Sequence, residues 1–267
     1  MKQKPQAVHL WAIAFWLIAW QLAAMALQAA YPHGELLLAS PIDALLRLVA
    51  LAQTVSFWRA VAASSAHILG GFLLSGTLAV LLAALSARYR YLAALLAPIV
   101  SVVKSVPVAS FIILALIWVS SRNLAFLISA LMVFPSIYVN VLAGIQSADR
   151  QLLEMAQVFR IPLRRRIWGI YIPQALPYFR SAIRVSLGLC WKAGAAAEVI
   201  GLSGGSIGER LYEAKIYLQT PDLFAWTAVI VLLSAIFERL FLHILDKISE
   251  RLACNGADRK QPEQDLS

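Results

Sequence analysis

The sequence predicts an all-α integral membrane protein with six transmembrane helices and with both termini in the cytoplasm. The first observation is composition: of the 267 residues, 61% are hydrophobic and 14% are charged, whereas an ordinary globular chain is about 45–50% apolar and about 25% charged. The second is that the apolar residues form long blocks rather than an amphipathic repeat, which is typical of a chain in a bilayer. The third is that lysines and arginines gather in the connections on one side.

Each apolar block has about 20 residues or more, enough to cross a hydrocarbon core of about 30 Å at about 1.5 Å per residue. Helix is expected throughout, because the core holds no water to satisfy an unpaired backbone group. The first block also resembles a secretion signal, but it is long for one and is expected to remain as an N-terminal anchor, residues 1–30. The expected spans are Leu10–Ala30, Arg59–Ala87, Tyr91–Val119, Asn123–Gln146, Ala175–Ile200 and Leu223–Leu245.

The connections between these spans differ in charge and in structure. A net charge of +9 would suit a nucleic-acid-binding protein. Basic residues between apolar blocks are instead what the positive-inside rule expects, so no nucleic-acid partner is predicted. On the outer side, residues 31–57 contain a short helix that Ser40 can cap and whose first turn suits Pro41. A second short outer helix, Ile207–Leu218, is expected after a glycine-rich turn.

The cytosolic stretch EMAQVFRIPLRRRIWGIYIPQALP carries four arginines between two apolar spans. Apolar residues at helical spacing predict an amphipathic helix over Gln151–Arg160, which Ile161-Pro162 ends. A second short helix, Leu163–Tyr171, is expected to follow, with a turn at Pro173. The stretch is either a solvated loop whose arginines only set topology, or a projection that docks a helix into a groove of a cytosolic partner.

The spacing of this stretch is specific. Glu154-Met155-Ala156 is followed by Arg160 and, nine residues later, by Ile170-Tyr171-Ile172-Pro173. This resembles the pattern E-A-A, three residues, G, nine residues, I-x-L-P of the inner-membrane permeases of binding-protein-dependent ABC importers. LLAPIVSVVKSVPVASFIILALIW and RVSLGLCWKAGAAAEVIG also resemble the nitrate/sulfonate/taurine branch of that family. Met155, Ile172 and Arg160 depart from the pattern, and an arginine at 160 argues against the tight left-handed turn that glycine permits.

The resemblance implies a methionine-importer-like type I ABC permease fold in the bacterial inner membrane. The permease transmembrane domain would be 58–246, with a coupling segment at 150–173 and a cytoplasmic polar tail at 247–267. It further implies a permease homodimer in membrane lipid, two cytosolic ATPase subunits and a periplasmic or lipid-anchored solute-binding protein. The residues that would couple to the ATPase are Glu154, Met155, Ala156, Phe159, Arg160 and Pro173.

The resemblance also implies a class of substrate. The branch carries small anions such as sulfonates, taurine or nitrate. Related branches carry vitamin precursors, including thiamine-type pyrimidines and riboflavin.

The chain itself is not expected to be an enzyme. It has no GxxxxGK[ST] loop to hold nucleotide phosphates, and LSGGS at 202–206 is a chance match to the ABC ATPase signature. A membrane enzyme would need a cluster of His, Asp or Glu at one depth, but the four histidines are scattered, so no metal or cofactor is predicted. A self-sufficient secondary transporter stays open as an alternative.

Several polar residues fall inside the expected spans, where ionisable groups are costly and face a cavity or each other. Lys104 and Lys192 would line the translocation path and attract an anionic solute, or one of them would pair with Glu198 as a structural ion pair. Pro107 is expected to bend the third span, either as a gate beside the path or as a packing kink.

Overall fold

The computed structural model describes residues 10–257, and these are almost entirely helical, with no strand among them. Residues 258–267, which belong to the expected polar tail, lie outside the described residues. The elements are α1 (Leu10–Ala30), α2 (Gly34–Leu37), α3 (Pro41–Ala52), α4 (Val55–Arg88), α5 (Arg90–Ser105), α6 (Val108–Ala115), α7 (Ser121–Gln146), α8 (Arg150–Val158), α9 (Leu163–Arg166), the π-helical turn η1 (Ile167–Tyr171), α10 (Ile172–Gly201), α11 (Ile207–Ile216) and α12 (Thr220–Ala257).

The core is built around α7, which packs against α4 and against α10. Its inward side chains are fully buried together with side chains of both neighbours; the largest are Ile68, Leu124, Ile128, Ile137, Leu187 and Trp191. Close packing requires glycine at one point, since a Cβ at Gly71 would lie 2.3 Å from the carbonyl oxygen of Phe126. A second, smaller core joins the first turns of α4 and α12 to α11 around Phe57 and Trp226.

Four helices in the described part of the chain are long and apolar enough to cross a membrane: α1, α4, α7 and α12. α5 and α6 pass the same test only as a pair, and they are bent by 104° where they meet. The expected third span, Tyr91–Val119, is thus divided into two helices, and the bend expected at Pro107 is present between them. α10 is long enough to cross a membrane, with 30 residues. It is not among the apolar helices, because it carries Arg180, Arg184, Lys192 and Glu198.

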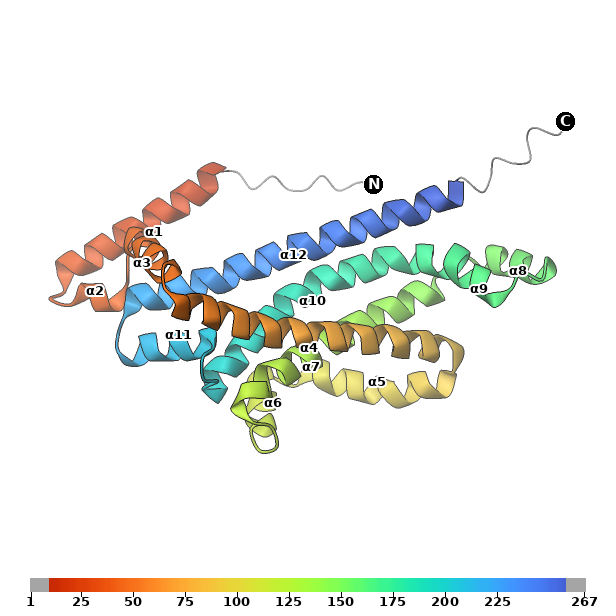
Figure 1. The fold of residues 1–267 in the computed structure, drawn as a ribbon, viewed down its shortest axis with the longest axis horizontal. Helices are drawn as coiled ribbons and strands as arrows, with labels where there is room; N and C mark the ends of the chain where they lie inside the picture. Colours follow the sequence, from red (N-terminus) through yellow and green to blue (C-terminus); the bar gives the residue numbers. More distant parts are fainter. Residues whose placement is uncertain (1–9, 258–267) are drawn as a thin grey trace.

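The short helices divide between the two ends of the molecule. Figure 1 shows α2, α3 and α11 at one end, and α8, α9 and the turn between α4 and α5 at the other. The expected outer helices are both present. Ser40 caps α3 by accepting a hydrogen bond from the Asp43 amide at 3.1 Å, and Pro41 is its first residue. α11 covers most of the predicted Ile207–Leu218 and follows Gly205, whose φ is +76°.

Candidate functional site

The stretch between α7 and α10 forms a helical projection at the start of α10. We call residues 149–171 the docking hairpin. Asp149 caps α8 by accepting a hydrogen bond from the Gln151 amide at 2.8 Å. The amide of Asp149 donates to Oε1 of Gln174 in α10, also at 2.8 Å. The start of the hairpin is therefore tied to the first turns of α10.

The end of α8 closes with a left-handed residue. The Ile161 amide donates to the Ala156 carbonyl at 2.9 Å, and the Arg160 amide donates to the Gln157 carbonyl at 3.0 Å. These two bonds are the Schellman motif, which satisfies carbonyls at a helix end. The φ of Arg160 is +48°, so the expectation that arginine would prevent the left-handed turn is wrong. The paired bonds offset a steric penalty of about 1–2 kcal/mol for a residue with a Cβ.

The second half of the hairpin continues into α10 without a break. The predicted helix Leu163–Tyr171 is present, but its last five residues form the π-helical turn η1. The turn expected at Pro173 is wrong, because Pro173 lies in the first turn of α10. Proline is tolerated there because the wider π turn before it gives its ring room.

The hairpin exposes a set of large apolar side chains that we call the apolar patch. Its members are Met155, Val158, Phe159 and Leu163, and their exposed fractions are 47%, 78%, 72% and 68%. Ala156 is fully buried on the opposite face of α8. The sequence predicted one apolar stripe over α8, whereas the structure divides it between an inward and an outward face. Val158 and Leu163 were missed because they do not share the stripe's helical spacing.

The charged residues of the hairpin have separate environments. Glu154 is exposed and pairs with Arg150 one turn earlier, at 3.6 Å. Arg166 is structural, because its Nε donates to the Ile161 carbonyl at 2.8 Å and braces the hairpin. Arg164 and Arg165 are exposed. The hairpin thus presents an apolar patch beside two exposed arginines.

The four residues expected along the translocation path differ in their exposure and in their partners. Lys104 is exposed in the last turn of α5, and Pro107 caps α6 at the 104° break. Lys192 is exposed on α10, whereas Glu198 is 1% exposed on the same helix. Within residues 10–257, neither lysine forms an ion pair with Glu198. The structural ion pair is therefore not observed, and the break at Pro107 is much larger than a packing kink.

Glu198 takes its partners from other elements. Its Oε2 accepts a hydrogen bond from the Ser64 hydroxyl at 2.7 Å and from the Gly208 amide at 3.1 Å. Ser64 Oγ in turn accepts from the Ile207 amide at 2.9 Å. The group links α4, α10 and the start of α11. No local pattern in the sequence pointed to Ser64 as a partner.

Ion pairs also join α10 to α12. Arg180 contacts Asp246 at 3.0 Å, and Arg184 contacts Glu238 at 3.6 Å. The positive charges of two arginines on α10 are thereby balanced by two carboxylates on α12. An open cavity of about 400 Å³ lies beside these pairs, and it is lined by Pro173, Leu176, Pro177, Arg180, Ser181, Arg184, Leu245 and Asp246.

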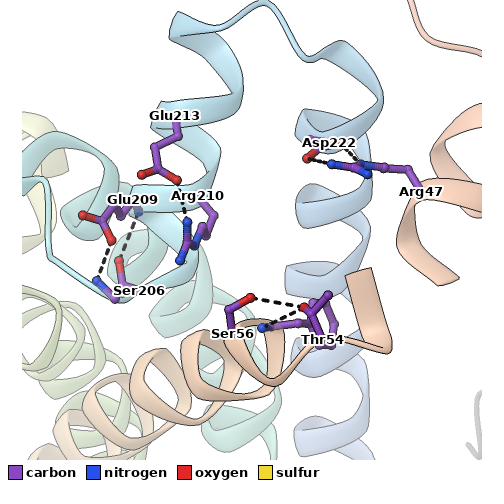
Figure 2. Close-up of polar contacts among 10 residues, drawn as sticks. Arg47, Thr54, Ser56, Ser206, Glu209, Arg210, Glu213 and Asp222 are labelled. Carbon is purple, nitrogen blue, oxygen red and sulfur yellow. Dashed lines mark hydrogen bonds and ion pairs between the residues drawn. The ribbon is translucent and has the colours of Figure 1, made fainter. Parts of the chain in front are cut away.

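At the end of the molecule opposite the docking hairpin, α3 is held against α12 by an ion pair (Figure 2). Both Nε and an Nη of Arg47 donate to the carboxylate of Asp222, with Nη2 to Oδ2 at 3.0 Å. This hydrogen bond raises the pKa of the Arg47 guanidinium above its ordinary value. The Thr220 hydroxyl donates to the Leu36 carbonyl at 2.7 Å and fastens α2 to the same place.

The described part of the chain holds no group of three or more His, Cys, Asp or Glu side chains placed to bind a metal ion.

Comparison with known proteins agrees with this arrangement. Residues 75–252 match the family described as binding-protein-dependent transport system inner membrane component. A Brucella melitensis protein named as an ABC transporter permease is 28% identical over 208 residues, covering 78% of this chain and 84% of its own. SsuC of Escherichia coli, named for aliphatic sulfonates transport, is 30% identical and covers 69% and 70%. RibX of Chloroflexus aurantiacus, named as a riboflavin transport system permease protein, is 27% identical and covers 73% and 71%.

Proposed function

Since the chain belongs to the family of binding-protein-dependent transport system inner membrane components, we propose that it is the subunit of an ABC importer through which a small solute crosses. The chain is a multi-pass protein of the inner membrane and a transport component rather than an enzyme. ATP hydrolysis is assigned to separate cytosolic ATPase subunits, and delivery of the solute to a periplasmic or lipid-anchored solute-binding protein. A homodimer in membrane lipid completes the proposed assembly.

The observation that carries the coupling role is the apolar patch of the docking hairpin. Large apolar side chains exposed on a polar projection mark an interaction surface, and a short helix with such a face fits a groove in a partner. The hairpin lies at the end opposite α3 and α11 (Figure 1). This supports a topology in which the hairpin is cytosolic and α3 and α11 face outward. Phe159 and Met155 would enter the ATPase groove, and Glu154, Arg164 and Arg165 would set its orientation.

The proposed topology keeps six spans, both termini in the cytoplasm and a permease domain at 58–246. The spans are α1, α4, the bent pair α5–α6, α7, α10 and α12. We count α10 among the spans because three of its charged side chains have partners within the protein. Arg180 and Arg184 pair with acids of α12, and Glu198 is hydrogen-bonded inside the protein, which is how charged residues are tolerated at membrane depth.

The proposed solute is a small anion such as a sulfonate, taurine or nitrate. The names of SsuC and of TauC, a taurine transport system permease protein of Escherichia coli, support this class. So does the exposure of Lys104 and Lys192 on helices proposed to span, because a cation there attracts an anion when it borders a polar path. A vitamin precursor is the alternative, and the relative named for riboflavin transport favours it.

The test is co-purification. The chain is expressed with the genes that neighbour its own and isolated in detergent. Wild type is expected to bring an ATPase with it, and Phe159→Asp and Glu154→Arg are expected to lose that ATPase. Tyr217→Asp is the matched control, since Tyr217 is equally exposed at the opposite end of the molecule. Absence of an ATPase with wild type would contradict the proposal and favour a self-sufficient secondary transporter.

A further inference from the structure

α10 connects the two ends of the molecule as one continuous helix. It starts at Ile172, directly after the docking hairpin, and ends at Gly201, a few residues before α11. At about 1.5 Å per residue, its 30 residues extend over about 45 Å. A displacement of the hairpin is therefore carried along α10 to its last turn. Any helix that is bound to this last turn then moves with it.

The last turn of α10 is fixed to α11 by a buried carboxylate. Glu198 Oε2 accepts the Gly208 amide at 3.1 Å and the Ser64 hydroxyl at 2.7 Å, while Ser64 Oγ accepts the Ile207 amide at 2.9 Å. Both Glu198 and Ser64 are almost completely buried. The amides of Ile207 and Gly208 belong to the first turn of α11, where backbone donors have no partner within their own helix. A negative carboxylate is also favoured at that end by the helix dipole.

The two helices touch through their backbones at this point. A Cβ on Gly208 would lie 2.2 Å from the Cβ of Glu198 and 2.6 Å from its carbonyl carbon. The turn that leads into α11 is closed locally as well: Ser206 Oγ accepts the Glu209 amide at 3.1 Å, and the Glu209 carboxylate accepts the Gly205 amide (Figure 2). α11 is therefore rigid at its start and is joined to α10 without an intervening layer of side chains.

Sliding α11 away from α10 would be costly. It would leave the Glu198 carboxylate and the donors of Ser64 and Gly208 buried without partners, and an unmet buried group costs more than an average hydrogen bond contributes. One carboxylate oxygen, Oε1, already has no hydrogen-bond partner among the described residues. Loss of a further hydrogen bond from Glu198 would therefore be costly. For this reason α11 is expected to move together with α10.

We propose that Glu198 is a positioning residue that locks α11 to α10 and α4, so that the state of the ATPase at the docking hairpin is transmitted to the outer face. The outer end of α11 carries the exposed side chains Ile216, Tyr217 and Leu218, and their position is what Glu198 controls. This proposal rests on the proposed function, because it requires an ATPase at the hairpin. It gives Glu198 a mechanical role in place of contact with the solute.

The contact itself is tested by hydrogen exchange on the purified chain in detergent. Glu198→Ala is expected to speed exchange at the Ile207 and Gly208 amides by about tenfold, as loss of a buried hydrogen bond to a charged group predicts. Glu198→Gln is expected to stay near wild type, since one amide oxygen can accept both bonds. Glu213→Ala is the control, because its carboxylate pairs within α11, with Arg210 at 2.8 Å. Unchanged exchange in Glu198→Ala would overturn the lock.

Transmission is tested with a reporter at the outer end. A fluorophore is placed at Tyr217→Cys in a Cys254→Ser background; Cys190 is buried. The complex with its ATPase is then compared with and without ATP and vanadate. A signal change that survives Glu198→Gln and is lost in Glu198→Ala supports the proposal.

A change retained in Glu198→Ala, or absent from a wild-type complex that still binds its ATPase, overturns the proposal alone. Failure of wild type to bind any ATPase overturns the proposed function instead, and the hydrogen-exchange result still decides whether the lock exists.

Discussion

Arg47 on α3 and Asp222 in the first turn of α12 form a two-bond ion pair across 175 positions of sequence. The Asp222 side chain is 12% exposed and that of Arg47 is 45% exposed. The pair adds a polar link between α3 and α12, which also pack against each other through the smaller core around Phe57 and Trp226.

Arg47→Ala is expected to lower the free energy of unfolding by about 1 kcal/mol, a modest value because solvent screens the half-exposed guanidinium. Arg47→Lys should recover only part of the loss, since lysine cannot make the paired bonds. Thermal unfolding in detergent measures both. Arg122→Ala is the control, because Arg122 is exposed and has no ion pair within residues 10–257. Equal losses in Arg47→Ala and Arg122→Ala would contradict the role of the pair.

Arg160→Gly is expected to stabilise the docking hairpin by about 1 kcal/mol, because glycine adopts a φ of +48° without the steric penalty of a Cβ. Arg160→Ala should give no such gain, since alanine keeps the Cβ. Hydrogen exchange at the Ile161 amide, which closes the motif, reports the change. Faster exchange in Arg160→Gly would show that the arginine side chain itself holds the turn.

Substitution of glycine by alanine is expected to have opposite effects on stability at two positions. Gly71→Ala is expected to destabilise the chain by about 2 kcal/mol or more, because the new methyl would meet the Phe126 backbone at 2.3 Å. Gly188→Ala is its matched control: nothing lies within 4 Å of a Cβ there, so helix propensity should raise stability by about 1 kcal/mol. Thermal unfolding of the two variants tests the packing. Destabilisation of the isolated chain by Gly188→Ala would contradict this account.

Lys192→Met and Lys104→Met are expected to reduce uptake of taurine or an alkanesulfonate about fivefold or more, through loss of a cation that attracts the anion. ATPase binding should be unchanged, because Lys104 belongs to α5 and Lys192 to α10, outside the docking hairpin. Uptake by proteoliposomes that contain the complete complex measures the effect. Lys215→Met is the control, as Lys215 is exposed on α11. Wild-type uptake in both variants would remove the lysines from the path.

Sequence reasoning succeeded where the signal is local. The cap at Ser40 and the limits of α8 and α11 depend on residues a few positions apart, and the structure has them within about two residues, the usual uncertainty of helix ends. It failed where distant parts meet. Ser64 lies 134 positions from Glu198, and no pattern at either site identifies the other. Proline at 107 predicted a bend, but only packing of α6 on α7 and α10 fixes an angle of 104°.

The 104° bend between α5 and α6 restricts what can surround this part of the chain in a membrane. α6 has eight residues and rises only about 12 Å, well short of a hydrocarbon core of about 30 Å. Backbone that leaves the helix at membrane depth is tolerated only where protein or water meets it, never lipid tails. Pro107 and Lys104 are exposed at this corner of the single chain. In the proposed topology, where α5 and α6 together form one span, this corner must meet water or a second subunit rather than lipid tails.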